Sequence, residues 1–219
     1  MPVPLVFYYG LRSPYSWMAD RLLADCLPDA ARAAIEYVPY WAPRPQTLQA
    51  LQARGASTLY RDMSRARFMY ILGDVKSAVR RLGYPLRWPV DGPEPDWELP
   101  HRACLEAPST ERADVLRRAL FAARFEHGRN ICDPQVVQDA MREAGVDMQA
   151  DAGSPTHDGP DDPAVVALER AFKHGVFGMP FFVVGREKFW GVDRLQFALR
   201  AAGLPWSEVA AAWLGETVA

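Results

Sequence analysis

The sequence predicts an α/β fold in which a mainly α-helical insertion, residues 45–162, interrupts a sheet-containing domain made of residues 1–44 and 163–219. Two observations predict this arrangement. A strand-like apolar run at 5–9 is followed by a helical stretch, a second run at 176–184 is followed by a short hairpin and then a helix, and most of the chain between them has helical periodicity. The 219 residues are 49% hydrophobic, which suits one domain with an insertion or two small lobes.

The first strand, residues 5–9, runs into a turn and a helix that begins at Ser13-Pro14-Tyr15-Ser16. Proline suits the first helical position, because its missing N–H would have no partner there. Ser13 is then expected as the N-cap, beside the free N–H groups and the positive end of the helix dipole. On its own this pattern favours a purely structural cap. The hydroxyl at this position can also hydrogen-bond a thiolate supplied from outside.

The second strand is expected at 34–40, and Pro43-Arg44-Pro45 ends that first segment. Apolar residues at helical spacing then predict the insertion, for example Phe68, Ile71, Leu72 and Val75 in its longest helix. The expected helices span 47–53, 64–82, 99–106, 110–128 and 134–144, and a polar loop is expected at 151–162.

The chain returns through a helix at 163–174 to the run at 176–184, which Gly178-Met179-Pro180 interrupts. Proline removes a ladder donor inside a strand, and a cis Met179–Pro180 bond would explain its presence. Such a turn would leave the N–H and C=O of Met179 unpaired, so that an extended peptide could add to the sheet there. Residues 185–190 predict a turn and a short strand, and the segment from Gly191 opens a helix that ends before Gly203.

Four motifs occur in one order along the chain: Phe7-Tyr8-Tyr9 with Ser13 to Trp17, Gly128 to Pro134, Gly175 to Pro180, and Phe189 to Leu195. In these motifs the chain resembles the kappa-class glutathione transferase and 2-hydroxychromene-2-carboxylate isomerase family, a branch of the DsbA-like proteins. The resemblance implies a thioredoxin-like domain interrupted by a helical insertion. It also implies glutathione as cofactor, a small aromatic or electrophilic substrate, and a homodimer.

The resemblance assigns roles to individual residues. Ser13 would hold the sulfur of glutathione, while Met179 and Pro180 would hold its backbone. Asp193, with the backbone of Val192, would hold the γ-glutamyl end, although on sequence alone Asp193 is expected to be an N-cap or first-turn acid. Ser16 is given only a supporting part, and no residue is assigned to the second substrate.

The chain departs from the resemblance at two places. The family commonly has Asp three residues before the serine, where this chain has Gly10. An asparagine that contacts the ligand in the family has no counterpart in the stretch from Arg54 to Leu59. Among other candidates, Arg12 could meet a substrate carboxylate but is expected to be solvated. Arg65 and Arg67, at the start of the longest helix, correspond to a region that faces the active site in the family, whereas a charge pair at a helix start is ordinarily a surface feature.

Aromatic residues near the motifs are expected mainly in the core, although Tyr8, Trp17 and Phe177 could shape a pocket for an aromatic compound. Arg194 is expected at the surface.

The three cysteines, Cys26, Cys104 and Cys132, form no Cys-x-x-Cys pair, and their odd number favours reduced thiols. Cys26 is expected in the core and Cys132 in a structural role. The four histidines are scattered, so no metal site is expected.

The net charge is −2, from 25 basic and 27 acidic side chains, which favours neither nucleic acid nor an anionic membrane as partner. No apolar stretch is long enough to span a bilayer, and the N-terminus lacks the basic region of a signal peptide. The chain is therefore expected to be cytoplasmic.

Three functions remain open. The first is a glutathione-dependent enzyme, either an isomerase that regenerates glutathione or a transferase that releases a conjugate. The second is a thiol oxidoreductase, which the missing Cys-x-x-Cys argues against. The third is a binding module whose proline turn holds a peptide without activating a thiol.

Overall fold

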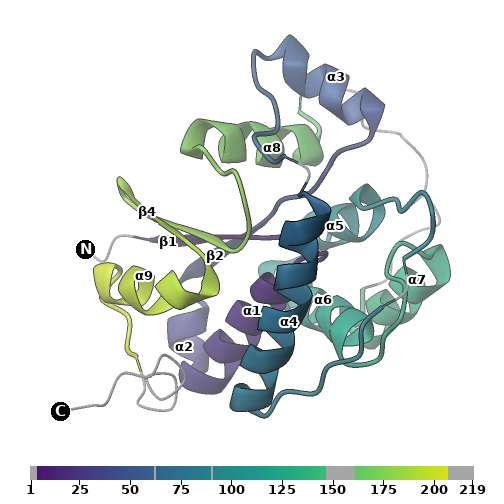
Figure 1. Ribbon diagram of the computed structural model, residues 1–219. Coiled ribbons are helices and arrows are strands. Elements are labelled where there is room, and N and C mark those ends of the chain that lie inside the picture. Colours follow the sequence, from purple (N-terminus) through teal and green to yellow (C-terminus); the bar gives the residue numbers. More distant parts are fainter. Residues whose placement is uncertain (1–3, 62, 90, 147–160, 207–219) are drawn as a thin grey trace.

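A four-stranded mixed sheet forms the centre of the computed structural model, which describes residues 4–61, 63–89, 91–146 and 161–206 (Figure 1). The strand order is β2-β1-β3-β4. Strand β1 (Leu5–Tyr9) pairs in parallel with β2 (Ile35–Pro39) and antiparallel with β3 (Phe181–Val184), which in turn pairs antiparallel with β4 (Glu187–Trp190). The two central strands are buried at every residue, whereas β4 at the edge is mostly exposed.

Helices cover both faces of this sheet. In Figure 1 the sheet is seen nearly edge-on, with α8 (Pro163–His174) on one side and α1 (Pro14–Cys26) and α9 (Leu195–Ala201) on the other. A short helix α2 (Asp29–Arg32), which the sequence did not predict, leads from α1 into β2. The first and last parts of the chain thus share one sheet, as predicted.

The segment between β2 and α8 is helical, as predicted. Its helices are α3 (Pro45–Ala53), α4 (Arg65–Leu82), α5 (Glu98–Leu105), α6 (Thr110–Phe125) and α7 (Pro134–Glu143). Side-chain N-caps from Ser64, Ser109 and Asp133 explain why three of them begin where they do. The loop predicted at 151–162 lies mostly outside the described residues.

Element ends differ from prediction by a few residues. Helix α6 ends at Phe125 rather than at Gly128, and α3 begins at Pro45, two residues earlier than expected, because proline is tolerated at N1. The run at 176–184 becomes a strand only from Phe181, directly after Pro180, because proline cannot donate to the ladder.

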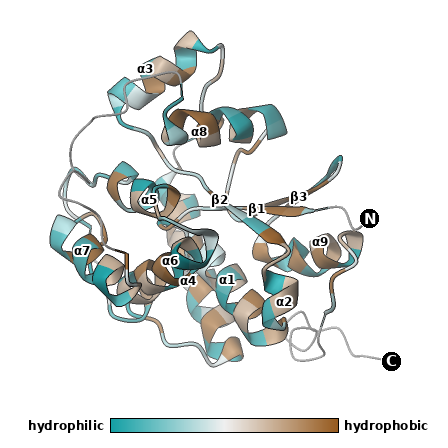
Figure 2. Ribbon diagram, turned by 180° about the vertical axis from the view of Figure 1, so that it is seen from behind, coloured by the Kyte–Doolittle hydropathy of each residue, from teal (hydrophilic) through white to brown (hydrophobic). Residues whose placement is uncertain are grey.

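One hydrophobic core extends across the sheet into the insertion. Trp17 of α1 is fully buried and stacks on Phe125 of α6 at 5.3 Å between ring centroids. Figure 2 shows strands β1 and β3 coloured as hydrophobic, whereas much of α7 is hydrophilic. Tyr8 is also fully buried, so the prediction that Tyr8 and Trp17 are core residues is confirmed. Cys26 packs against this core, half-buried.

Among the described residues, no helix is both long and apolar enough to cross a membrane.

Candidate functional site

Ser13 caps α1, as the sequence predicted. Its N–H donates to the carbonyl of Gly10 at 2.9 Å, and its Oγ accepts from the N–H of Ser16 at 3.2 Å. Pro14 occupies the first helical position. The capping hydroxyl therefore lies at the positive end of the helix dipole, where an anion is stabilised.

The second serine of the motif has a different environment. Ser16 is fully buried, and its Oγ accepts from the N–H of Gly10 at 3.2 Å. This hydrogen bond ties the start of α1 to the end of β1. Because Ser16 is occupied inside the turn, Ser13 is the serine of the motif that remains partly exposed.

The Met179–Pro180 bond is cis, as predicted, and lies opposite Ser13. The Ser13 hydroxyl donates to the carbonyl oxygen of Met179 over a long 3.4 Å. The prediction that both polar groups of Met179 are unpaired is therefore wrong for the carbonyl, because the capping serine reaches it. In the described part of the chain the Met179 N–H has no hydrogen-bond partner.

Asp193 lies in a 3₁₀ turn, Val192–Arg194, between β4 and α9. The residue in the N-cap position is Gly191, whose φ of 107° favours glycine. Asp193 is therefore a first-turn acid rather than the cap. Its carboxylate is 58% exposed, 3.4 Å from the guanidinium of Arg194, which is at the surface as expected.

The five residues to which the resemblance assigns glutathione line one cleft of about 1490 Å³, namely Ser13, Met179, Pro180, Val192 and Asp193. The cleft lies between the sheet-containing part and the insertion, because residues of α4, α5 and α6 also line it. No cysteine of the described chain is among its lining residues.

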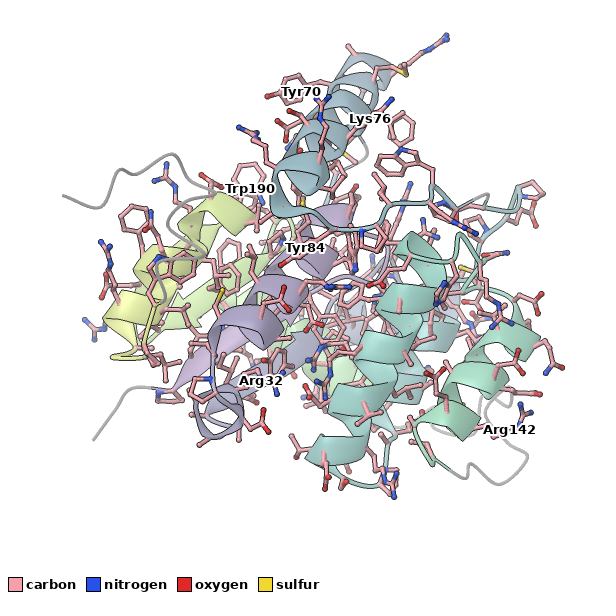
Figure 3. The ribbon with its side chains drawn as sticks, turned by 90° about the horizontal axis from the view of Figure 1, so that it is seen from below. Arg32, Tyr70, Lys76, Tyr84, Arg142 and Trp190 are labelled. Carbon is pink, nitrogen blue, oxygen red and sulfur yellow. The ribbon has the colours of Figure 1, made fainter. Side chains whose placement is uncertain are left out.

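Helix α4 forms one wall of the cleft. Figure 3 shows this helix at the periphery of the molecule, with Tyr70 on its outer part and Trp190 beside it. The guanidinium of Arg67 lies 5.9 Å from the centre of the Trp190 ring, and Trp190 packs edge-on against Phe177 at 4.9 Å. Arg67 and Phe177 line the cleft, whereas Arg65 does not.

Two features that the sequence did not reveal hold the site in place. His101 of α5 is fully buried, and its Nε2 accepts from the N–H of Leu11 at 2.9 Å, two residues before Ser13. The hydroxyl of Tyr15 donates to Asp74 of α4 at 2.6 Å. His101 belongs to no recognisable local pattern, and although Tyr15 lies in the Ser13 motif, its partner on α4 could not be read from that motif, since each contact crosses the boundary with the insertion.

Gly10, one of the two departures from the resemblance, is explained by packing. A Cβ at this position would overlap the sulfur of Met179 and lie 3.1 Å from the carbonyl oxygen of Tyr40. Glycine here allows the Met179 side chain to fold against the end of β1, so a larger residue would require Met179 to move.

Burial also governs the cysteines. It raises the pKa of the Cys104 and Cys132 thiols to about 12, so both stay protonated at neutral pH. A nucleophilic sulfur at Ser13 would therefore have to come from a bound molecule.

Comparisons with known proteins agree with this architecture. A model of the DSBA-like thioredoxin domain family matches residues 4–202. The chain is 26% identical over 197 residues to a 2-hydroxychromene-2-carboxylate isomerase of Sphingobium xenophagum, covering 87% of this chain and 93% of the relative.

Two solved structures share the fold. One is a 2-hydroxychromene-2-carboxylate isomerase, with a TM-score of 0.63, 19% identity, and coverage of 91% of this chain and 94% of the other. The second is the cytosolic disulfide reductase DsbM of Pseudomonas aeruginosa with GSH, with a TM-score of 0.53, 14% identity and coverage of 96% of both chains.

Proposed function

The chain belongs to the DSBA-like thioredoxin domain family, and from that premise we propose that it is a glutathione-dependent isomerase of the 2-hydroxychromene-2-carboxylate type. The observation that carries the proposal is the convergence of Ser13, Met179 and Asp193 on one cleft. The relative from Sphingobium xenophagum, an isomerase, aligns over most of both chains.

The residues of the cleft fit glutathione. The free N–H and the carbonyl of Met179 can pair with the backbone of an extended peptide as an added strand would. The exposed carboxylate of Asp193 can bind the ammonium of the γ-glutamyl end, beside the backbone of Val192. A cleft of about 1490 Å³ has room for a tripeptide and a small aromatic compound together.

Ser13 would act on the sulfur. In the structure, the Ser13 hydroxyl donates its single hydrogen to the carbonyl oxygen of Met179 over a long contact. A peptide N–H bound to that carbonyl would release the hydroxyl to donate to a thiolate instead, and the N-terminus of α1 would add its dipole. Bound glutathione would supply a thiolate that adds reversibly to a conjugated double bond and leaves again, with no net oxidation.

Glutathione titration tests the role of Ser13. We expect the wild type to bind glutathione and lower the pKa of its thiol, measured by ultraviolet thiolate absorbance against pH. Ser13→Ala should lose about one to two pKa units of that lowering, whereas Ser13→Thr, which keeps a hydroxyl, should retain part of it. Binding without any lowered thiol pKa in the wild type would favour the alternative binding module.

Product analysis separates the remaining alternatives. With 2-hydroxychromene-2-carboxylate and glutathione, an isomerase returns all of the glutathione, whereas a kappa-like glutathione transferase accumulates a conjugate. Insulin reduction by this protein would instead point to a thiol oxidoreductase.

A further inference from the structure

Two arginine side chains lie against one indole ring in the wall of the cleft. The guanidinium carbon of Arg12 lies 5.3 Å from the centre of the Trp97 ring, and that of Arg124 lies 4.8 Å from it. All three residues line the cleft together with Ser13. The face of an aromatic ring attracts cations, so Trp97 holds the residue that precedes Ser13 close to a residue of α6.

The two arginines differ in their partners. Arg124 is only 4% exposed and donates to both carboxylate oxygens of Asp91, at 2.6 and 3.0 Å. Among the described residues its buried Nε–H has no hydrogen-bond partner, an arrangement that costs free energy. Arg12 is exposed, and in the described part of the chain it has no carboxylate partner.

The two arginines at this wall carry one more positive charge than the described carboxylates beside them neutralise. Within the described ranges Asp91 balances Arg124, and no carboxylate compensates Arg12 beside Ser13. The cleft as a whole is also richer in cations than in anions. Its lining arginines are Arg12, Arg61, Arg67, Arg81, Arg124 and Arg194, against the three aspartates Asp74, Asp91 and Asp193.

We propose that Arg12, with Trp97 and Arg124, forms a subsite for the single carboxylate of a conjugated aromatic substrate. The proposal rests on the proposed function, since it concerns the second substrate of that reaction. The guanidinium of Arg12 binds the carboxylate as a charge-assisted pair, and the exposed ring of Trp88, which also lines the cleft, contacts the conjugated part.

Two other arginines of the cleft, Arg67 and Arg194, are available for the carboxylates of glutathione. Arg67 lies against Trp190, and Arg194 lies beside Asp193, at the end of the cleft proposed for the γ-glutamyl group. Arg12 belongs instead to the wall formed by Trp97 and Arg124. The subsite is therefore free for a second anion while glutathione is bound.

Binding of trans-cinnamate and of its neutral analogue cinnamamide tests the subsite without glutathione. By calorimetry, we expect wild-type protein to bind cinnamate about tenfold more tightly than cinnamamide. Arg12→Gln should abolish that preference and Arg12→Lys should keep part of it. Arg81→Gln removes an arginine that lines the same cleft but is not among the cations found over the Trp97 ring, so it should leave the preference unchanged.

Four results overturn the subsite: equal binding of the two probes by the wild type, binding of neither, a preference that Arg12→Gln retains, or an Arg81→Gln effect as large as that of Arg12→Gln. Glutathione titration of the same proteins separates this outcome from failure of the proposed function. A wild type that prefers cinnamate but does not bind glutathione keeps the subsite and loses the glutathione chemistry.

Discussion

His101 connects the turn that carries Ser13 to the insertion through a single ring. Because Nε2 accepts from the N–H of Leu11, the ring proton belongs on Nδ1, which donates to the carbonyl of Trp97 at 2.5 Å. The ring also stacks on Trp41 at 5.3 Å. A protonated ring would lose the hydrogen bond from Leu11, because both of its nitrogens would then be donors.

Burial lowers the pKa of His101 to about 4. Below the ordinary histidine pKa of about 6.5, His101 is protonated in the unfolded chain but stays neutral in the folded chain. The free energy of unfolding therefore falls as the pH drops from about 6.5 to about 4. His101 should contribute on the order of 3 kcal/mol to this fall. Urea unfolding of His101→Gln across this range should show a shallower pH dependence than the wild type.

His127→Gln provides the matched control, because His127 is exposed. Its pH dependence of unfolding should follow the wild type. Identical slopes for His101→Gln and wild type would contradict the role assigned to His101.

Gly10 and Met179 should behave as one packing unit. A methyl group at position 10 meets the Met179 sulfur, and such overpacking typically costs about 1–3 kcal/mol. We expect Gly10→Ala to destabilise the wild type by about that amount and to cost less when Met179→Ala has removed the obstacle. Urea unfolding of the two single variants and the double variant gives the coupling. Strictly additive effects would mean that the backbone, not Met179, requires glycine.

Helix α4 is joined to α1 by the hydrogen bond from Tyr15 to Asp74. Burial and this carboxylate raise the pKa of the Tyr15 hydroxyl well above its usual value, so it remains a donor over the physiological range. Tyr15→Phe should cost about 1 kcal/mol and should speed amide exchange in α4 more than in α6, measured by hydrogen–deuterium exchange. Tyr70→Phe removes a hydroxyl from an exposed ring of α4 and should leave exchange unchanged. Faster exchange in both helices alike would indicate a global loss of stability instead.

The sequence predicted those helices whose starts are set by a neighbouring side chain. Ser13 and Asp133 indicate where their helices begin, because the side-chain oxygen of each accepts from a free N–H of the first turn. The four-residue helix α2 carries no such signal, since no side chain caps it. The exact start of β3 was missed because an apolar run does not reveal where ladder pairing begins.

The candidate site divides in the same way. Ser13 and the Met179–Pro180 turn could be predicted because each lies in a short motif beside a strand. Trp97 and His101 could not, because their roles depend on how the insertion packs against residues far away in sequence. Arg12 was expected to be solvated; it is exposed, but its guanidinium also lies over an indole in the cleft.

At the scale of the whole molecule, the homodimer implied by the family resemblance stays a prediction. Met69 and Tyr70 of α4 are 57% and 69% exposed and do not line the cleft. We expect sedimentation velocity to give a dimer, and Met69→Glu with Tyr70→Glu to shift it toward monomer. A wild-type monomer would refute the prediction. A dimer that is unaffected by these changes would place its interface elsewhere.

The insertion and the sheet-containing part are also linked by a buried ion pair. Arg117 of α6 and Asp20 of α1 are 3% and 4% exposed, and Arg117 Nε donates to Asp20 Oδ1 at 2.8 Å. The guanidinium also lies 3.7 Å from the centre of the Tyr37 ring on β2. One cation thus contacts the first helix, the sheet and the insertion, which should make these parts unfold together.

Breaking this pair on one side should therefore destabilise the whole chain. Arg117→Met leaves the buried carboxylate of Asp20 without its partner, which typically costs about 3–5 kcal/mol. Asp20→Leu combined with Arg117→Met removes both charges and should cost clearly less, because no unpaired charge is then buried. Far-ultraviolet circular dichroism and tryptophan fluorescence should report the same urea midpoint in each variant, since the seven tryptophans include Trp17 on α1 and Trp97 beside α5. Two separate midpoints in the wild type would show that the insertion unfolds on its own and that the pair does not couple it to the sheet.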